Sequence, residues 1–210
     1  QEATLDKDVV EKFNELFTVS IKRRLRSDVP LGTSLSGGLD SSSIVATITN
    51  LLRKSESTLP RSPYGPVKDA VGQSSNEQLR TFSAIFPGFE KNEEKYIDEV
   101  TTYFSLQSFK TIISDSEVPL LFQKLIKRQD EPFGSASALP QYKVFELAAQ
   151  NNVKVLLDGQ GADETLAGYH KYYKWYWQEL FIKRKLGKSG ELKKAKELGV
   201  NEKFGIKNII

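Results

Sequence analysis

The spacing of apolar residues divides the chain into alternating helix-like and strand-like segments. Apolar side chains recur at intervals of three and four over residues 6–27, which predicts an amphipathic helix. Similar patterns after capping residues predict further helices, and short runs of β-branched and aromatic residues between turn signals predict strands. The predicted helices are 6–27, 40–52, 92–104, 117–128, 139–151 and 169–186, and the predicted strands are 29–35, 80–86, 109–113 and 153–157.

This alternation of strands and helices indicates the fold class. It is typical of a parallel sheet that is covered by helices on both faces. We therefore expect an α/β fold with a doubly wound, mainly parallel sheet. Ligands of such sheets bind beyond the carboxyl ends of the strands, where the strand order reverses. Two turns directly follow predicted strands, at 36–42 and 158–164, and they are the candidate ligand sites.

Two segments interrupt the pattern. Residues 54–79 contain several Pro, Gly and Ser with few apolar anchors, which predicts a flexible surface insertion. Residues 187–210 are rich in lysine and loosely patterned. We expect residues 1–186 to form one domain and residues 187–210 to begin a further helical part.

Composition narrows the chemistry that the chain can perform. Of its 210 residues, 27% are charged and 39% hydrophobic, and no apolar run is long enough to span a bilayer. The absence of Cys and the single His exclude disulfides, thiolate metal sites and clusters of His. A net charge of +3 is too mild to indicate nucleic-acid binding. Because Met is absent even from position 1, we expect a piece of a longer protein.

The turn at 36–42 has the features of a phosphate site. It reads Ser-Gly-Gly-Leu-Asp-Ser-Ser, and its two glycines allow a ligand to approach the backbone closely. The helix that follows would offer unpaired N–H groups to an anion, and Ser36, Ser41 and Ser42 would add hydroxyls. Asp40 would suit a divalent cation that bridges to phosphate. The alternative is a plain glycine turn in which Asp40 only caps the helix.

The turn at 158–164 reads Asp-Gly-Gln-Gly-Ala-Asp-Glu and carries three carboxylates. Asp163 could share a Mg²⁺ ion with Asp40. The alternative is a strand-to-helix turn whose acidic residues cap the helix. The metal interpretation gains weight because the two turns occur as a pair.

Together these turns resemble a known family. The first turn is similar to the PP-loop of the ATP pyrophosphatase superfamily, whose members cleave ATP between the α- and β-phosphates and adenylate a substrate. The second turn, with Gly168 and Tyr169 after it, resembles the Ser-Gly-Glu-Gly-(Ala/Ser)-Asp-Glu…Gly-Gly-Tyr signature of glutamine-dependent asparagine synthetases. The order of the segments 81–86 and 130–132 between the turns also fits, and the resemblance covers most of residues 8–180.

The resemblance implies a set of site residues. It implies a pyrophosphate site at Ser36, Gly37, Gly38, Asp40 and Ser41, nucleotide contacts at Leu35, Ala84, Asp158 and Gly159, and magnesium ligands at Asp40 and Asp163. Gln160 stands where the family uses a catalytic Glu, and Asp158 replaces the family's Ser. These two differences leave the identity of the acceptor carboxylate open.

The resemblance also implies a reaction and its partners. The enzyme would be a carbon–nitrogen ligase of the amidotransferase type that uses ATP and Mg²⁺. It would adenylate aspartate, release pyrophosphate and form asparagine with ammonia from glutamine. We expect no nucleic-acid or membrane partner, a cytoplasmic location and a homodimer of the full-length protein.

The family pattern extends beyond these residues. It implies a glutaminase domain with a Cys nucleophile before residue 1 and a catalytic Lys in a helical part further downstream, so we expect the chain alone to be inactive. Two alternatives stay open. One is a related PP-loop amide ligase that acts on another carboxylate, and the other is a noncatalytic nucleotide-binding domain.

Overall fold

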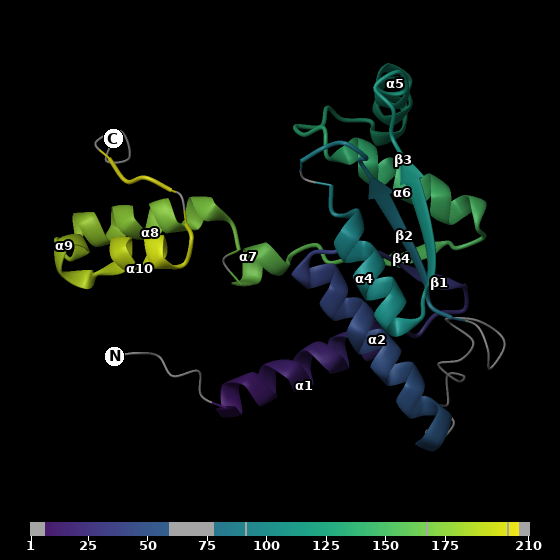
Figure 1. Cartoon of the computed structure of the whole chain (residues 1–210), viewed down its shortest axis with the longest axis horizontal. Helices are drawn as coiled ribbons and strands as arrows, with labels where there is room; N and C mark the ends of the chain where they lie inside the picture. Colours follow the sequence, from purple (N-terminus) through teal and green to yellow (C-terminus); the bar gives the residue numbers. More distant parts are fainter. Residues whose placement is uncertain (1–6, 59–77, 91, 167, 201, 206–210) are drawn as a thin grey trace. The chain divides into compact units, whose positions relative to one another are not determined.

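The computed structural model gives the chain as two compact units, Gln1–Gly159 and Gln160–Ile210, each of which is described by itself (Figure 1). The residues that the structure describes are 7–58, 78–90, 92–166, 168–200 and 202–205. Within these residues, no helix combines the length and the apolar character needed to cross a membrane.

The first unit is built on a four-stranded sheet in which all neighbouring strands are parallel. Its strands are β1 (Leu31–Ser34), β2 (Arg80–Ile85), β3 (Gln107–Ile112) and β4 (Val155–Leu157). The spatial order is β3-β2-β1-β4. The chain therefore builds outward from β1 to β3 and then returns to the other side of β1. The strand order reverses between β1 and β4, so their carboxyl ends form the switch point of the sheet.

Helices cover both faces of this sheet, which confirms the predicted α/β class. The helices of the first unit are α1 (Lys7–Arg24), α2 (Leu39–Thr58), α4 (Glu94–Phe104), α5 (Val118–Gln129) and α6 (Ala138–Gln150). Successive side chains of a strand point to opposite faces of the sheet, and the two leucines of β4 pack on the two different faces. Leu157 packs in the cluster that α1, α2 and α4 share, whereas Leu156 packs with α6. The helix α5 then packs on α6 through Leu121, Leu125 and Leu139.

The predicted insertion begins later than expected. The helix α2 continues to Thr58, so the first part of the predicted segment 54–79 is helical, and the prediction is wrong there. The chain offers no Pro or Gly to stop the helix until Pro60, which disfavours a helical residue before it. The segment 59–77 lies outside the described residues, and the buried Leu79 leads directly into β2.

The second unit is helical. It contains α7 (Ala162–Leu166), α8 (His170–Ile182), α9 (Leu186–Ser189) and α10 (Glu191–Glu197). Its core holds Trp177, which is 1% exposed and contacts the rings of Tyr173 and Phe204. The lysine-rich segment predicted as loosely patterned thus contributes two short helices, and Ala195 of α10 is buried. The predicted boundary after residue 186 falls inside this unit.

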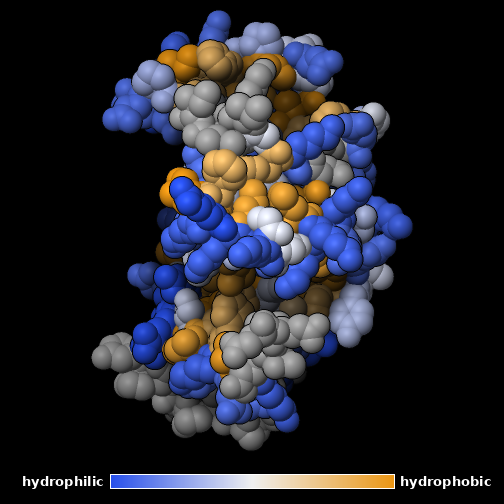
Figure 2. All heavy atoms as spheres, turned by 90° about the vertical axis from the view of Figure 1, so that its left-hand side faces the viewer, coloured by the Kyte–Doolittle hydropathy of each residue, from blue (hydrophilic) through white to orange (hydrophobic). Residues whose placement is uncertain are grey.

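Apolar side chains also reach the surface. Figure 2 shows hydrophobic patches between the hydrophilic side chains on the face that it presents. The apolar stripe of α1 is an example from the first unit, because Val9, Phe13 and Leu16 are half exposed or more. The last turns of α1 pack against the core of the first unit, through Ile21 and through Leu25, which follows the helix.

Candidate functional site

The loop after β1 is held in place by the neighbouring strand. The Leu35 N–H donates to the Phe82 carbonyl at 3.0 Å, and the Ser83 hydroxyl donates to the Leu35 carbonyl at 2.6 Å. The backbone then turns at Gly37, whose φ of +83° lies in the left-handed region that favours glycine. The predicted turn therefore starts from a fixed point on the sheet.

Two serines close this loop on itself. The hydroxyls of Ser36 and Ser41 lie 3.1 Å apart, and the Ser41 hydroxyl also lies 3.3 Å from the Gly38 carbonyl, to which it can donate. The Gly38 N–H donates to the Ser36 hydroxyl at 3.3 Å. These long, shared hydrogen bonds hold the loop in shape, and an anion with stronger acceptor oxygens could replace them.

The start of α2 supplies the donors of an anion site. Its first helical hydrogen bond runs from the Ser42 N–H to the Gly38 carbonyl at 3.1 Å. The N–H groups of Leu39, Asp40 and Ser41 therefore have no acceptor within the helix. With the helix dipole they form a positive end that favours an anion.

Asp40 is the second residue of α2. It lies inside the first turn of α2, half-buried, and its carboxylate has no hydrogen bond or ion pair with any residue that the structure describes. A carboxylate without a protein partner beside an anion site is suited to bind a cation. An acidic residue in the first turn also complements the helix dipole, so both interpretations of Asp40 stay predictions.

The second turn reaches the first one at the switch point. A Cβ added to Gly159 would lie 3.2 Å from Asp40 Cβ and 3.2 Å from the Ser41 nitrogen. Asp158, immediately before it, accepts a hydrogen bond from the Gly159 N–H through Oδ1 at 2.7 Å. The parallel pairing of β4 with β1 brings these residues together, as the sequence predicts. Only glycine leaves this face of the helix start open.

A wall of the loop is formed by the first turn of α4. A Cβ on Gly37 would lie 2.9 Å from Tyr96 Cβ, 3.0 Å from the Ile97 nitrogen and 3.2 Å from the Glu93 carbonyl oxygen. Partial burial raises the pKa of the Glu93 carboxyl. Since Gly37 packs directly on backbone atoms, the position of α4 sets the position of the loop.

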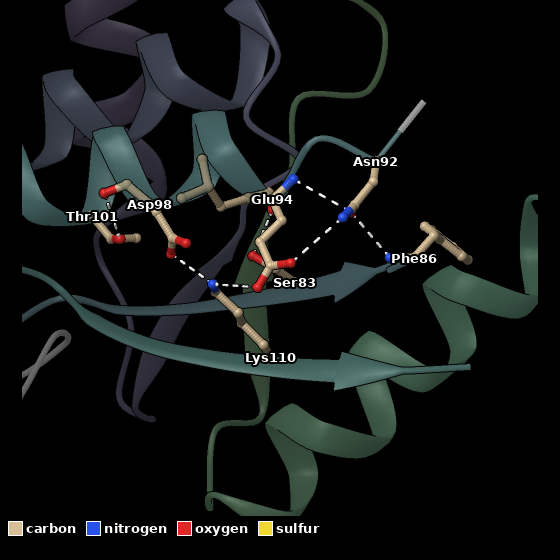
Figure 3. Close-up of polar contacts among 8 residues, drawn as sticks. Ser83, Phe86, Asn92, Glu94, Asp98, Thr101 and Lys110 are labelled. Carbon is tan, nitrogen blue, oxygen red and sulfur yellow. Dashed lines mark hydrogen bonds and ion pairs between the residues drawn. The ribbon is translucent and has the colours of Figure 1, made fainter. Parts of the chain in front are cut away.

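A polar network fastens this turn to the sheet (Figure 3). Lys110 of β3 pairs with Glu94 at 3.0 Å and with Asp98 at 2.6 Å. Asn92 Oδ1 accepts hydrogen bonds from the N–H groups of Phe86 at 3.1 Å and Glu94 at 3.4 Å. Burial lowers the pKa of Lys110, but the hydrogen bonds and charges of the two carboxylates outweigh it and raise this pKa overall.

Sequence reasoning missed this network. On a helix, Glu94 and Asp98 look like two charges of a solvated face, and Lys110 looks like an exposed strand residue. A useful signal was present in the spacing, because residues four apart on a helix share one face. That face meets a lysine only if β3 lies beside α4, which the spacing alone does not fix.

Other predicted residues lie in the second unit. Gln160 is exposed and begins that unit, and Asp163 is in the first turn of α7. The Asp163 carboxylate occupies the space in front of Gly168, where a Cβ would lie 1.9 Å from Oδ1. The Gly168 N–H donates to the Asp163 carbonyl at 3.0 Å. A side chain at position 168 would therefore clash with this carboxylate.

Next to it, Tyr169 donates a hydrogen bond to Glu164 at 2.8 Å. This bond lowers the pKa of Glu164 and is the largest cause that raises the pKa of Tyr169 to about 12. The hydrogen bond ties the end of α7 to the start of α8.

The two predicted nucleotide contacts on the strands differ in exposure. The Leu35 side chain is 2% exposed and belongs to the core cluster, whereas Ala84 is half-buried beside the cluster that contains Phe82. Within the described part of the chain, no group of three or more His, Cys, Asp or Glu is gathered as a metal site. The role of these residues toward a nucleotide or metal stays a prediction.

Comparison with known proteins places the chain among its relatives. Residues 12–204 match the family described as asparagine synthase. A putative glutamine-hydrolyzing asparagine synthetase 2 of Methanocaldococcus jannaschii is 34% identical over 85% of this chain and 30% of its own length. The glutamine-hydrolyzing asparagine synthetase 1 of Bacillus subtilis is 29% identical over 80% of the chain and 23% of its own length. Amidase chyE of Penicillium rubens is 23% identical over 81% of the chain and 24% of its own length. The chain thus spans less than a third of the length of these relatives.

Proposed function

The chain belongs to the asparagine synthase family, and we propose that it is the ATP-binding part of an enzyme that makes asparagine from aspartate and ammonia. We propose residues 1–186 for this part, a range that includes the first compact unit and the beginning of the second. The ammonia would come from glutamine through a glutaminase domain, as the resemblance to the family implies. A cytoplasmic homodimer is part of the same proposal.

The observation that carries this proposal is the loop at the switch point. It combines free N–H groups at the start of α2, a left-handed Gly37 and the close approach of Gly159. An anion that carries several oxygens suits such a set of converging donors. The pyrophosphate of ATP would lie there, held by Ser36, Gly37, Gly38, Asp40 and Ser41, with Leu35, Ala84, Asp158 and Gly159 near the nucleoside.

In the proposed reaction, an aspartate carboxylate oxygen attacks the α-phosphorus of ATP. The bond to the β-phosphate oxygen breaks, which gives an aspartyl adenylate and pyrophosphate. Ammonia then attacks the acyl carbon, AMP leaves and the surplus proton is lost. The protein contributes positioning and donors for the negative charge of the leaving group. Gln160 would donate or accept a hydrogen bond at the adenylate, since its amide cannot take up a proton.

The residues present fit a magnesium ion. Asp40 presents a half-buried carboxylate with no partner among the described residues, next to the proposed phosphate site. Asp163 is the second oxygen donor that we propose. When bound, Mg²⁺ would neutralise phosphate charge. Mg²⁺ prefers one or two carboxylates together with substrate phosphates, so a cluster of three acidic residues is not required.

The proposal is tested by substrate-dependent exchange between ATP and pyrophosphate in the full-length protein. We expect aspartate to support exchange and other carboxylic acids in a panel to support little. Wild type is compared with Gln160→Glu while aspartate is varied. If wild type shows no aspartate-dependent exchange and the Glu variant gains it, aspartate is not the natural acceptor.

A second candidate acceptor is favoured by one observation. Gln160 and Asp158 both replace residues of the family signature. A related amide ligase that acts on another carboxylate would show exchange with an acid other than aspartate. A noncatalytic nucleotide-binding domain would show none, although Mg-ATP would still raise its melting temperature.

A further inference from the structure

The loop at 36–41, which is anchored to β2 through Leu35, packs on α4 at Gly37. At Gly37 there is no room for a methyl group, because Tyr96 Cβ and the Ile97 nitrogen already fill the space at 2.9 and 3.0 Å. Ile97 is 1% exposed and packs α4 on the core together with Val100 and Phe104. A shift of the first turn of α4 by a few tenths of an ångström would change the space that the loop occupies.

Two residues outside α4 hold that turn through polar contacts: Asn92, which accepts hydrogen bonds from the N–H groups of Phe86 and Glu94, and Lys110 of β3. Lys110 lies between Glu94 in the first turn and Asp98 in the next (Figure 3). Its side chain is 24% exposed, and that of Glu94 is 32% exposed, so the first pair is partly shielded from water. The two carboxylates are four residues apart on one helix face, where like charges repel each other. The lysine therefore neutralises a repulsion and links α4 to β3 at once.

Lys110 makes no contact with the loop among the interactions of the described residues. We propose that Lys110 is a positioning residue for the 36–41 loop, which it holds in its binding shape through the first turn of α4. The inference rests on the proposed function, in which this loop binds the phosphates of ATP. It adds a residue on β3 that the family signature in the two turns does not include.

The chain offers a matched control. Lys143 of α6 also bridges two carboxylates, Glu117 at 3.5 Å and Glu146 at 3.6 Å, with 16% of its side chain exposed. It lies between α5 and α6, on the sheet face opposite α4. Loss of either lysine should lower stability, but only Lys110 is connected to the loop.

The test compares Lys110→Met, Lys110→Arg and Lys143→Met with wild type in the full-length protein. Titration calorimetry gives the Kd for Mg-ATP, and hydrogen exchange without ligand gives the protection of the loop amides that have an acceptor, those of Ser36, Gly38 and Ser42. We expect Lys110→Met to raise the Kd about tenfold. Loss of an exposed ion pair has a small energetic effect and loss of a buried one a large effect, and the Lys110 pairs are partly buried. Amide protection in the loop should fall by about the same factor. The other two variants should stay within about twofold of wild type.

The two readouts separate the possible failures. Unchanged loop protection and unchanged Kd in Lys110→Met would overturn the positioning role. Equal losses in both methionine variants would also overturn it, because they would reflect general destabilisation. If wild type binds no Mg-ATP, the proposed function fails, while the exchange data still decide whether Lys110 orders the loop. Should Lys110→Met not fold, Asp98→Asn removes one pair at a 54% exposed site, and a smaller rise of about threefold is expected.

Discussion

Gly159 is the position at which a single methyl group best tests the site. Its Cα faces the start of α2, and a Cβ would lie 3.2 Å from both Asp40 Cβ and the Ser41 nitrogen, and 3.4 Å from the Asp40 carbonyl carbon. The φ angle of Gly159 is not positive, so alanine can adopt the backbone conformation of this residue without the strain of the left-handed region. The substitution Gly159→Ala therefore adds bulk and little else.

The size of the effect follows from these distances. Ordinary contacts between carbon atoms lie at about 3.5–4.0 Å, so the methyl group is too close by a few tenths of an ångström. Its neighbours include backbone atoms of a helix, which cannot rotate away. Overpacking of this kind costs about 1–3 kcal/mol. Because the displaced atoms include the proposed donor Ser41 N–H, we expect most of the cost in ligand binding, as a Kd for Mg-ATP raised about tenfold to a hundredfold.

Calorimetric titration of the full-length protein with Mg-ATP would measure this loss, together with thermal melting of the free protein. The control is Gly134→Ala, because a Cβ at Gly134 would meet no atom within 4 Å. The control should bind as wild type does. A Gly159→Ala protein that is folded and keeps the wild-type Kd would show that the start of α2 is not where the phosphates bind.

Three further predictions address other parts of the chain. Asp40→Asn and Asp163→Asn should each abolish magnesium-dependent ATP–pyrophosphate exchange while circular dichroism shows an intact fold, and a variant that retains exchange would exclude its residue as a metal ligand. Trp177→Ala should destabilise the second unit by about 3–5 kcal/mol, as judged by urea unfolding, because it empties the largest buried site there. An effect below about 1 kcal/mol would mean that the aromatic cluster does not hold this unit together. Hydrogen bonds from Ser114 lower the pKa of Glu117 from its usual value near 4.5, so the stability it contributes is present above that value and is lost as the pH falls through the lower folded pKa. Glu117→Gln should flatten the dependence of melting temperature on pH in that acid range, and an unchanged slope would contradict this assignment.

Much of the first unit could be predicted because its local signals agree with one another. The apolar pattern predicts all four strands of the sheet, and β2 agrees with its prediction to within one residue. The turn after β1 was identifiable because two glycines and a helix-start pattern coincide there. Its contact with Gly159 follows from the general behaviour of parallel sheets, in which strand ends meet at one edge.

The remaining errors have specific causes. The helix α2 continues to Thr58 because no residue before Pro60 has a helix propensity low enough to end it. The Pro, Gly and Ser content of residues 54–79, by contrast, predicts an insertion that begins at residue 54. The short helix α7 begins inside the predicted turn at 158–164. Because Gly159 and Gly161 are strong turn signals, the pattern does not predict the five helical residues that follow them. The role of Lys110 depends on which strand lies beside α4, and a charge pattern carries no information on that neighbour.

The order of the strands has a consequence for how the chain folds during synthesis. Leu31 of β1 pairs with Val155 of β4, so one edge of β1 finds its partner only after the ribosome has made all the intervening residues. The ribosome adds about 5–20 residues per second, so this edge of β1 stays unpaired for on the order of ten seconds. Meanwhile β2 can already occupy the other edge, and β1 exposes a free row of backbone donors and acceptors to other nascent chains. We therefore expect the nascent chain to be prone to pairing with other chains along this edge until β4 binds β1.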